Sequence, residues 1–267
     1  MQETMQPAAP QTEATTPTPA APERVYEEAG KDNLSLFDNA PRFTNWLYSE
    51  VKPFLKGAIL EIGAGTGTYS KKIIADFPES RVVLSDIDPV YVQRLNEMFR
   101  ENSKVTALGI NLDHTVRDQQ LHETFDAVIA LNVMEHIEDD VAAINNIYDI
   151  LNPGGVFVIL VPAHKFLYNV MDKSIGHFRR YNKKMMREKI ATTKFSIAKM
   201  FYFNFTSMFG WFVNGNILKK TVINDSALGA FDKVVPVVRG IEKTILRKKV
   251  GISLITVLKK PEETQAQ

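Results

Sequence analysis

Residues 58–67 read AILEIGAGTG, and this stretch decides the fold of the chain. The apolar run from Ala58 to Ile62 predicts a short buried strand, and three glycines at alternate positions follow it (Gly63, Gly65 and Gly67). Glycine allows a sharp backbone turn, and its missing Cβ lets a ligand approach the main chain. The stretch therefore predicts a strand, a tight ligand-holding turn and a helix in succession.

A second apolar run ends in an acid. Residues 81–85 read RVVLS, and Asp86 follows them. In nucleotide-binding α/β sheets, a carboxylate at the end of the second strand accepts hydrogen bonds from the ribose hydroxyls. Because parallel strands end at the same edge of a sheet, we expect Asp86 to lie beside the glycine turn. The two features predict a nucleoside-bearing cofactor at that edge.

The glycine spacing and the preceding acid distinguish between cofactors. A dinucleotide site has the spacing G-x-G-x-x-G and directs a helix N-terminus at a pyrophosphate. Here the spacing is G-x-G-x-G, and Glu61 stands two residues before the first glycine. A carboxylate at this position repels a pyrophosphate but tolerates an ammonium or sulfonium group. The pattern favours S-adenosyl-L-methionine over NAD, and an NAD-dependent oxidoreductase is the alternative.

Four motifs in this order resemble the class I S-adenosylmethionine-dependent methyltransferases, over residues 39–259. They are EIGAGTG (61–67), LSDIDP (84–89), FDAVIALNVMEH (125–136) and LNPGG (151–155). The alternation of apolar strands with helices independently predicts an α/β domain with a parallel sheet. The resemblance implies a Rossmann-like seven-stranded sheet whose last strand is antiparallel, inserted between the fifth and sixth, with a helical insertion between strands six and seven.

The resemblance also assigns the cofactor contacts. Glu61 is expected at the methionine end, directly or through water, with a structural acid that caps the glycine turn as the alternative. Leu112 and Asp113 are expected on the adenine, with Asn111 as a competitor. The remaining expected contacts are the backbone of Gly63, Ala64 and Gly65, Asp86 on the ribose, Ile87 on the adenine and Asn132 beside the methionine moiety.

Composition sets the domain organisation. The chain has 267 residues, 45% of them hydrophobic, a net charge of +1 and no cysteine, which fits one packed domain without disulfides or thiolate metal sites. Its first residues lack the features of a signal peptide, and no apolar run is long enough to span a membrane. We expect a disordered tail (1–22), an N-terminal helical lid (23–56), a methyltransferase core (57–203), a helical insertion (204–251) and a final core strand (252–260).

A polar run follows the predicted fifth strand and ends in GHFRRY (176–181). It resembles a run in a bacterial subgroup of these methyltransferases, some of which are fused to glycosyltransferase domains. The catalytic candidates are His177, His164 and Tyr181, and Arg179 and Arg180 are the substrate-binding candidates because paired arginines grip a phosphate or carboxylate. The alternative is a lid held by ion pairs, such as Asp172 with an arginine.

Two further side chains follow the predicted fourth strand. Glu135 and His136 occupy a position that is common in the family, and we favour capping or packing over catalysis for His136. A metal at His177 and Asp172 has no support from motif spacing, so no metal site is predicted.

Basic and apolar residues alternate in the insertion. Residues 214–250 contain eight Lys or Arg and three acids, beside aromatic and aliphatic side chains. This mixture suits an anionic membrane surface or a lipid-linked anionic substrate, and the alternative is a helical subdomain with a solvated basic face. Nucleic acid is not expected as a partner, since no recognised binding motif accompanies the charge.

The sequence therefore predicts methyl transfer to a small-molecule, glycan or lipid-linked acceptor, which is anionic. A binding module that retains the cofactor without transfer is the second alternative. We expect a cytoplasmic protein, peripheral at the inner membrane face, and the sequence sets no oligomeric state.

Overall fold

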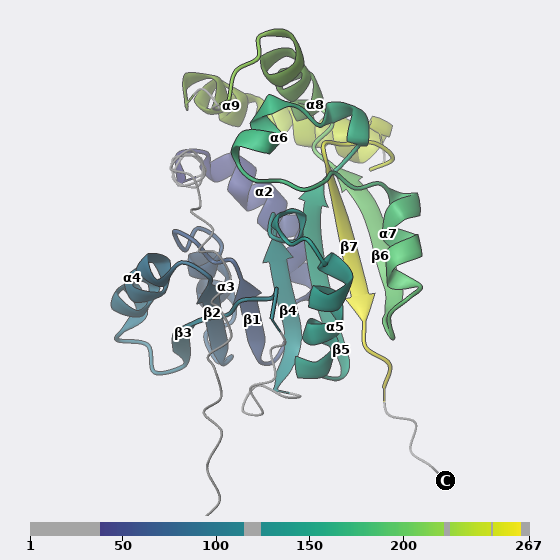
Figure 1. Cartoon of the computed structure of the whole chain (residues 1–267). Coiled ribbons are helices and arrows are strands. Elements are labelled where there is room, and N and C mark those ends of the chain that lie inside the picture. The colour runs from purple at the N-terminus through teal and green to yellow at the C-terminus, as the bar shows by residue number, and fades with distance from the viewer. Residues whose placement is uncertain (1–37, 115–123, 222–224, 247, 263–267) are drawn as a thin grey trace, which may run out of the picture.

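The structure, a computed structural model, describes residues 38–114, 124–221, 225–246 and 248–262. The expected tail and residues 23–37 of the expected lid lie outside these ranges. A seven-stranded sheet in the order β3-β2-β1-β4-β5-β7-β6 forms the centre of the molecule (Figure 1). Its strands are β1 (Ile59–Ile62), β2 (Val82–Asp86), β3 (Val105–Gly109), β4 (Phe125–Leu131), β5 (Leu151–Pro162), β6 (Ser196–Phe203) and β7 (Ser253–Lys259).

The strand directions confirm the predicted topology. Strands β1 to β5 are parallel to one another, while β7 pairs antiparallel with both β5 and β6. The last strand is thus inserted between the fifth and the sixth. Because β1 lies between β2 and β4, the turns after these three strands open at the same edge of the sheet.

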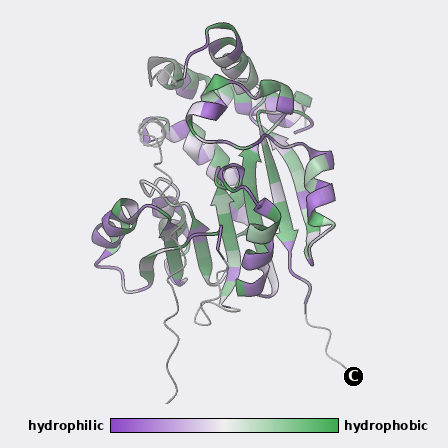
Figure 2. Cartoon of the chain, in the orientation of Figure 1, coloured by the Kyte–Doolittle hydropathy of each residue, from purple (hydrophilic) through white to green (hydrophobic). Residues whose placement is uncertain are grey.

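Helices cover both faces of the sheet. One face packs against α2 (Pro41–Val51), α3 (Ser70–Asp76), α4 (Pro89–Phe99) and α9 (Asp225–Ile241), and the other against α5 (Asp140–Ile150) and α7 (Lys183–Ile190). The strands are almost wholly apolar because both of their faces are buried, as Figure 2 shows by hydropathy. Asp88 caps α4, since its side chain accepts a hydrogen bond from the Val90 amide at 2.9 Å.

The structure corrects one predicted boundary. The LNPGG motif (151–155) has the Asn, Pro and Gly residues that predict a turn before a strand from Val156, but β5 already begins at Leu151. Phe125 pairs with Leu151 and Ala127 with Val156, so the register shifts between them. Gly154, with φ at 72°, bends the chain there. The bend remains inside the sheet as an irregularity because the residues on both sides of it still pair with β4.

Helical segments connect β6 to β7, at the upper end of the molecule in Figure 1. They are α8 (Ser207–Trp211), the π-helical turn η5 (Phe212–Ile217), α9 and the π-helical turn η6 (Glu242–Leu246). Two acids anchor them: Asp232 accepts from the Phe43 amide at 2.8 Å, and Glu242 from the Asn204 amide at 3.0 Å. Among the described residues, no helix combines the length and apolarity that crossing a membrane requires.

Candidate functional site

The turn after β1 has the geometry that only glycine adopts easily. Gly63 has φ at 70° and Gly65 at 51°, in the left-handed region. A Cβ on Gly63 would lie 2.5 Å from Cγ2 of Val133, which comes from the loop after β4. The Ala64 amide donates to the Ser85 carbonyl at 2.8 Å and so ties the turn to β2. The turn is therefore held between the ends of two strands.

Asp86, the last residue of β2, lies against this turn. Its Oδ2 accepts a hydrogen bond from the Gly65 amide at 2.9 Å, and its Oδ1 accepts one from the Asp88 amide at 3.0 Å. Burial raises the pKa of this carboxyl above its ordinary value, while the two amides oppose that shift. Each oxygen keeps a second lone pair, so the carboxylate can still accept two hydroxyl groups. The predicted proximity of Asp86 to the glycine turn is present.

Glu61 is buried inside β1. Its Oε2 accepts a hydrogen bond from the Ser70 hydroxyl at 2.6 Å, which links the acid to the first residue of α3. Burial raises the pKa of Glu61 to about 7. The contact with Ser70 is structural, but it lies at the start of α3 and not at the glycine turn that the alternative interpretation names. A nearby cation would favour the charged form of Glu61.

The residues expected around the adenine differ in exposure. Ile87 is 40% exposed and Leu112 is buried, whereas Asp113 is exposed. The Asn111 side chain accepts from the Asp113 amide at 2.9 Å and so shapes the loop. Ile87 also borders a surface hollow of about 600 Å³ between α4 and the end of β3. Ile87 thus presents an apolar surface beside Asp86, as a base requires.

Asn132 follows β4 directly and has φ at 55°, in the left-handed region that Asn tolerates. The backbone amide of Asn132 donates to the Leu160 carbonyl at 2.9 Å. The next residue is Val133, the side chain nearest to Gly63. The loop after β4 therefore meets the glycine turn after β1 at the position of Asn132.

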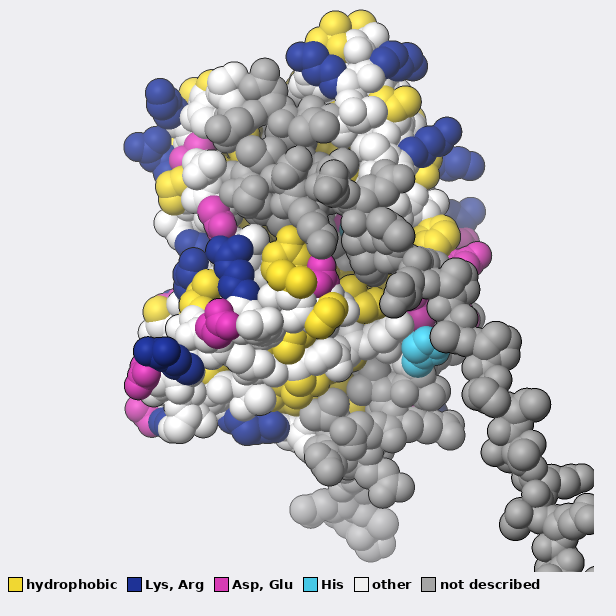
Figure 3. All heavy atoms as spheres, turned by 60° about the vertical axis from the view of Figure 1, so that its left-hand side comes forward, with side chains coloured by type: hydrophobic (Ala, Val, Ile, Leu, Met, Phe, Trp, Pro, Cys, Tyr) yellow, Lys and Arg dark blue, Asp and Glu magenta, His cyan; other side chains and the backbone are white. Residues whose placement is uncertain are grey.

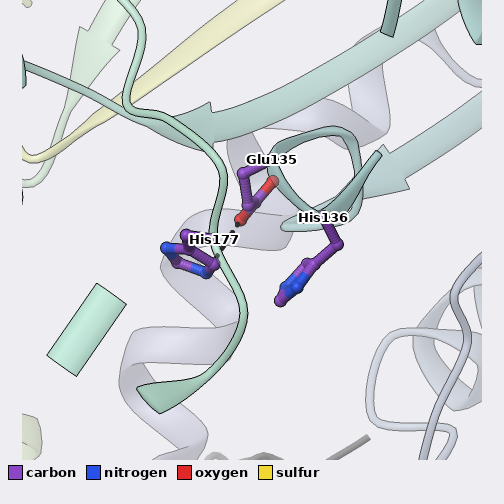
Figure 4. A group of neighbouring side chains, drawn as sticks. All are labelled: Glu135, His136 and His177. Atoms are coloured by element: carbon purple, nitrogen blue, oxygen red, sulfur yellow. Dashed lines mark ion pairs between the residues drawn. The ribbon is translucent and has the colours of Figure 1, made fainter. Parts of the chain in front are cut away.

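Three further polar side chains meet beyond Asn132 (Figure 4). Glu135 and His136 come from the short helix η3 (Met134–His136), and His177 comes from the run after α6 (Val170–Ser174). Oε1 of Glu135 lies 3.7 Å from Nε2 of His177, and the two imidazole centroids are 4.7 Å apart. Figure 4 shows the Glu135 and His177 side chains pointing toward each other, with the His136 ring beside them.

The GHFRRY run is fixed onto this loop by three of its members. The Phe178 amide donates to the Glu135 carbonyl at 2.9 Å. The Arg179 guanidinium donates to the carbonyls of Ile137 and Glu138 at 2.8 and 2.7 Å. The Tyr181 hydroxyl is buried, and it lies within hydrogen-bond distance of two acceptors, Oδ2 of Asp140 at 2.7 Å and the Met134 carbonyl at 3.1 Å. These contacts hold His177 over Glu135.

A buried ion pair orients His177. Its Nδ1 lies 2.8 Å from Oδ1 of Asp172, and Nε of Arg180 lies 2.8 Å from the same oxygen. Burial would raise the pKa of Asp172, but His177 and Arg180 hold it below its ordinary value. The Arg180 guanidinium also covers the Trp211 ring at 4.6 Å. The expected pairing of Asp172 with an arginine is therefore present, and the arginines make internal contacts.

His164 lies apart from this cluster. It has φ at 66°, and its ring stacks on Tyr202 with centroids 4.8 Å apart. Of the three predicted catalytic residues, only His177 joins the polar group after β4. Tyr181 is a core residue that positions the run. Glu135 and His136 supply the other two members, although the sequence favours capping or packing over catalysis for His136. The signal for them is an acid-histidine pair a few residues after the end of β4 at Leu131.

Comparisons with known proteins agree with this geometry. A family model described as a methyltransferase domain matches residues 60–157. The chain is 25% identical over 144 residues to malonyl-[acyl-carrier protein] O-methyltransferase 1 of Ilyobacter polytropus, with 51% of each chain covered. It is 31% identical over 102 residues to the reducing polyketide synthase Preu2 of Preussia isomera, covering 38% of this chain and 4% of that protein. The chain thus spans about half of one relative and a small part of the other.

Solved structures share the fold. A putative sarcosine dimethylglycine methyltransferase from Galdieria sulphuraria aligns with a TM-score of 0.60 at 12% identity, covering 88% of this chain and 99% of that one. The family match over residues 60–157, the relatives and the seven-stranded topology together support a class I S-adenosylmethionine-dependent methyltransferase domain in this chain.

Proposed function

We propose that this protein transfers a methyl group from S-adenosylmethionine to a small-molecule, glycan or lipid-linked acceptor. The observation that carries the proposal is the Asp86 carboxylate, which the Gly65 and Asp88 amides fix against the glycine turn. The relatives named as an O-methyltransferase and as polyketide synthases support transfer to a small acyl-type acceptor.

The residues at this edge suit each part of the cofactor. Asp86 would accept the two ribose hydroxyls, Ile87 would cover the adenine, and the turn at Gly63 leaves room where a Cβ would collide with Val133. Buried Glu61 would favour a cationic methionine end. When bound, the cofactor supplies a methyl group already activated by a positively charged sulfur, so the protein mainly has to orient the acceptor.

The acceptor side lies beyond Asn132, at the Glu135, His136 and His177 cluster. Because the Nδ1 proton of His177 is donated to Asp172, its Nε2 lone pair faces the cluster. This nitrogen is the group placed to act on an acceptor proton. The Arg180 side chain is 1% exposed and pairs with Asp172, so of the two predicted substrate contacts only Arg179, whose side chain is 19% exposed, could also reach an acceptor. Lys165 and Lys173, which are exposed in the same run of sequence, supply further positive charge.

Transfer is tested by incubating the purified chain with methyl-labelled S-adenosylmethionine and fractionated polar lipids, glycans and small metabolites. We expect label in one acceptor class and release of S-adenosylhomocysteine. Cofactor binding without any labelled product would support the non-transferring binding module instead. Tight binding of NAD with no binding of S-adenosylmethionine would establish an oxidoreductase.

We also infer that the helical insertion docks on an anionic membrane, where a lipid-linked acceptor would be reached. Along α9 and η6, Val234, Val237, Ile241 and Ile245 recur at helical spacing and are 45–72% exposed. Further exposed apolar side chains on or directly after α8 and η5 are Phe209, Phe212, Val213, Ile217 and Leu218.

Positive charge borders this apolar face. Lys219, Lys220, Lys233 and Lys243 are all exposed. Figure 3 shows hydrophobic side chains at the top of the molecule with Lys and Arg side chains on either side. Apolar side chains bordered by cations are typical of helices that lie in an anionic lipid interface. This charge complementarity favours a lipid surface over a protein partner.

Flotation with phosphatidylglycerol vesicles at low salt tests the docking. The wild type should be recovered with the floating vesicles, and the double variant Val237→Asp, Ile241→Asp should remain in the soluble fraction. A matched control, Val90→Asp, alters a valine that is 64% exposed on α4, and it should float like the wild type. Wild-type protein that remains in the soluble fraction would remove the inference.

A further inference from the structure

The Glu135 carboxylate is buried without the partners that a buried charge requires. The residue is 0% exposed, and neither Oε1 nor Oε2 has a hydrogen-bond partner within the part of the chain that the structure describes. Buried carboxylates are normally hydrogen-bonded, paired or bound to a metal. His177 comes within 3.7 Å, which is too long for a hydrogen bond. The Glu135 carboxylate therefore needs a hydrogen-bond donor or a cation.

Two imidazoles converge on the same space. One donor atom from each of Glu135, His136 and His177 lies within 4.8 Å of the others. Two ligand atoms that are each about 2.1 Å from one ion are about 3.4 Å apart in tetrahedral geometry. The observed 3.7 Å between Glu135 and His177 needs only a slight closure to reach this separation, and the wider separations within the group, up to 4.8 Å, need a side-chain rotation to reach it. The spacing suits a shared ion better than direct contact.

The surroundings prepare His177 as a ligand. Asp172 accepts the Nδ1 proton at 2.8 Å and is itself held by Arg180, so the Nε2 lone pair faces Glu135. A carboxylate behind a histidine fixes the tautomer and ring orientation in protein metal sites.

We propose that Glu135, His136 and His177 bind one divalent transition-metal ion. Two imidazole nitrogens and one carboxylate oxygen are the ligands of ions such as Zn²⁺, Mn²⁺ and Co²⁺, whereas Mg²⁺ and Ca²⁺ prefer oxygen. Three protein ligands leave coordination positions open. These positions would take a hydroxyl oxygen of the acceptor and assist loss of its proton, in place of the Nε2 lone pair of His177, which the ion would occupy. That catalytic role rests on the proposed function, whereas the binding of the ion does not.

Cobalt titration of the chelator-treated full chain tests the site without any activity assay. Co²⁺ is expected to bind one per chain and to give a visible d–d absorption. The single variants Glu135→Gln, which is isosteric, and His177→Gln should each bind Co²⁺ about tenfold to a hundredfold more weakly, or weaker still. A matched control, His164→Gln, changes a histidine outside the cluster and should bind Co²⁺ like the wild type.

Binding of S-adenosylmethionine, measured on the same samples, separates this proposal from the proposed function. Retained cofactor affinity in Glu135→Gln, with Co²⁺ binding lost, would support the site and show that the fold is intact. A wild-type chain that binds the cofactor but no cobalt would overturn the metal site alone. Equal Co²⁺ affinity in the wild type and in both ligand variants would overturn it as well.

Discussion

The amide of Gly65 donates a 2.9 Å hydrogen bond to Oδ2 of Asp86, and this bond joins the turn after β1 to the end of β2. The two elements are separated by helix α3 in the sequence, yet they form one cradle. The orientation of the carboxylate is set by the turn before any ligand arrives. Several consequences for stability and binding can be measured.

The glycine turn should not tolerate a side chain. In Gly63→Ala, the new Cβ would meet Val133 at 2.5 Å with φ at 70°. A strained backbone of this kind costs about 1–3 kcal/mol. We expect a lower unfolding free energy in urea and at least tenfold weaker cofactor binding. The control, Gly229→Ala, lies in α9 with no atom near its Cβ, and it should be neutral or stabilising. Equal behaviour of the two variants would refute the strain argument.

The ion pair behind His177 should be important for folding stability. Asp172 is 0% exposed and receives both His177 and Arg180, so Asp172→Asn leaves the buried guanidinium without its counter-charge. Loss of one partner of a buried pair costs about 3–5 kcal/mol. Chemical denaturation should show this loss. Glu101→Gln, which removes a surface pair with Arg100 whose side chains are 77% and 88% exposed, should change stability by less than about 0.5 kcal/mol.

Glu61 should make the apo protein less stable as pH rises. Its folded pKa, about 7, lies above the ordinary value of 4.5, so the folded state holds the proton more tightly than the unfolded state. The free energy of unfolding therefore falls by up to about 3 kcal/mol between about pH 4.5 and pH 7. Above pH 7, Glu61 causes no further change. Urea unfolding at pH 5 and pH 8 measures the effect. Glu135, whose pKa burial raises to about 8, adds a slope of the same sign, so the variant Glu61→Gln should reduce the slope without removing it. An unchanged slope would show that Glu61 does not contribute to it.

The cofactor edge was predictable from the sequence because its determinants are local. The turn at Gly63 and the acid at Asp86 each follow an apolar run, and the strand order then brings them together. The bend at Gly154 was placed outside the sheet because a glycine-rich segment signals a turn, whereas pairing on both sides of it is a tertiary effect.

The acceptor side was less predictable because it depends on contacts distant in sequence. No local pattern shows that His177 reaches Glu135, 42 residues earlier, or that Arg179 donates to carbonyls of the loop after β4. Charge alone favoured substrate binding for the two arginines. Their actual partners depend on how the run from α6 to α7 folds back over η3, which the amino-acid types do not encode locally.

Calorimetric titration with S-adenosylmethionine tests the central claim, that the glycine turn and Asp86 hold the cofactor, most directly. Asp86→Ala removes two charge-assisted hydrogen bonds to the ribose, each worth about 1.5–3 kcal/mol, so affinity should fall at least a hundredfold while circular dichroism shows an intact fold. Glu79→Ala, a control at a side chain that is 90% exposed, should bind like the wild type. An Asp86→Ala protein that binds the cofactor with wild-type affinity would contradict the account.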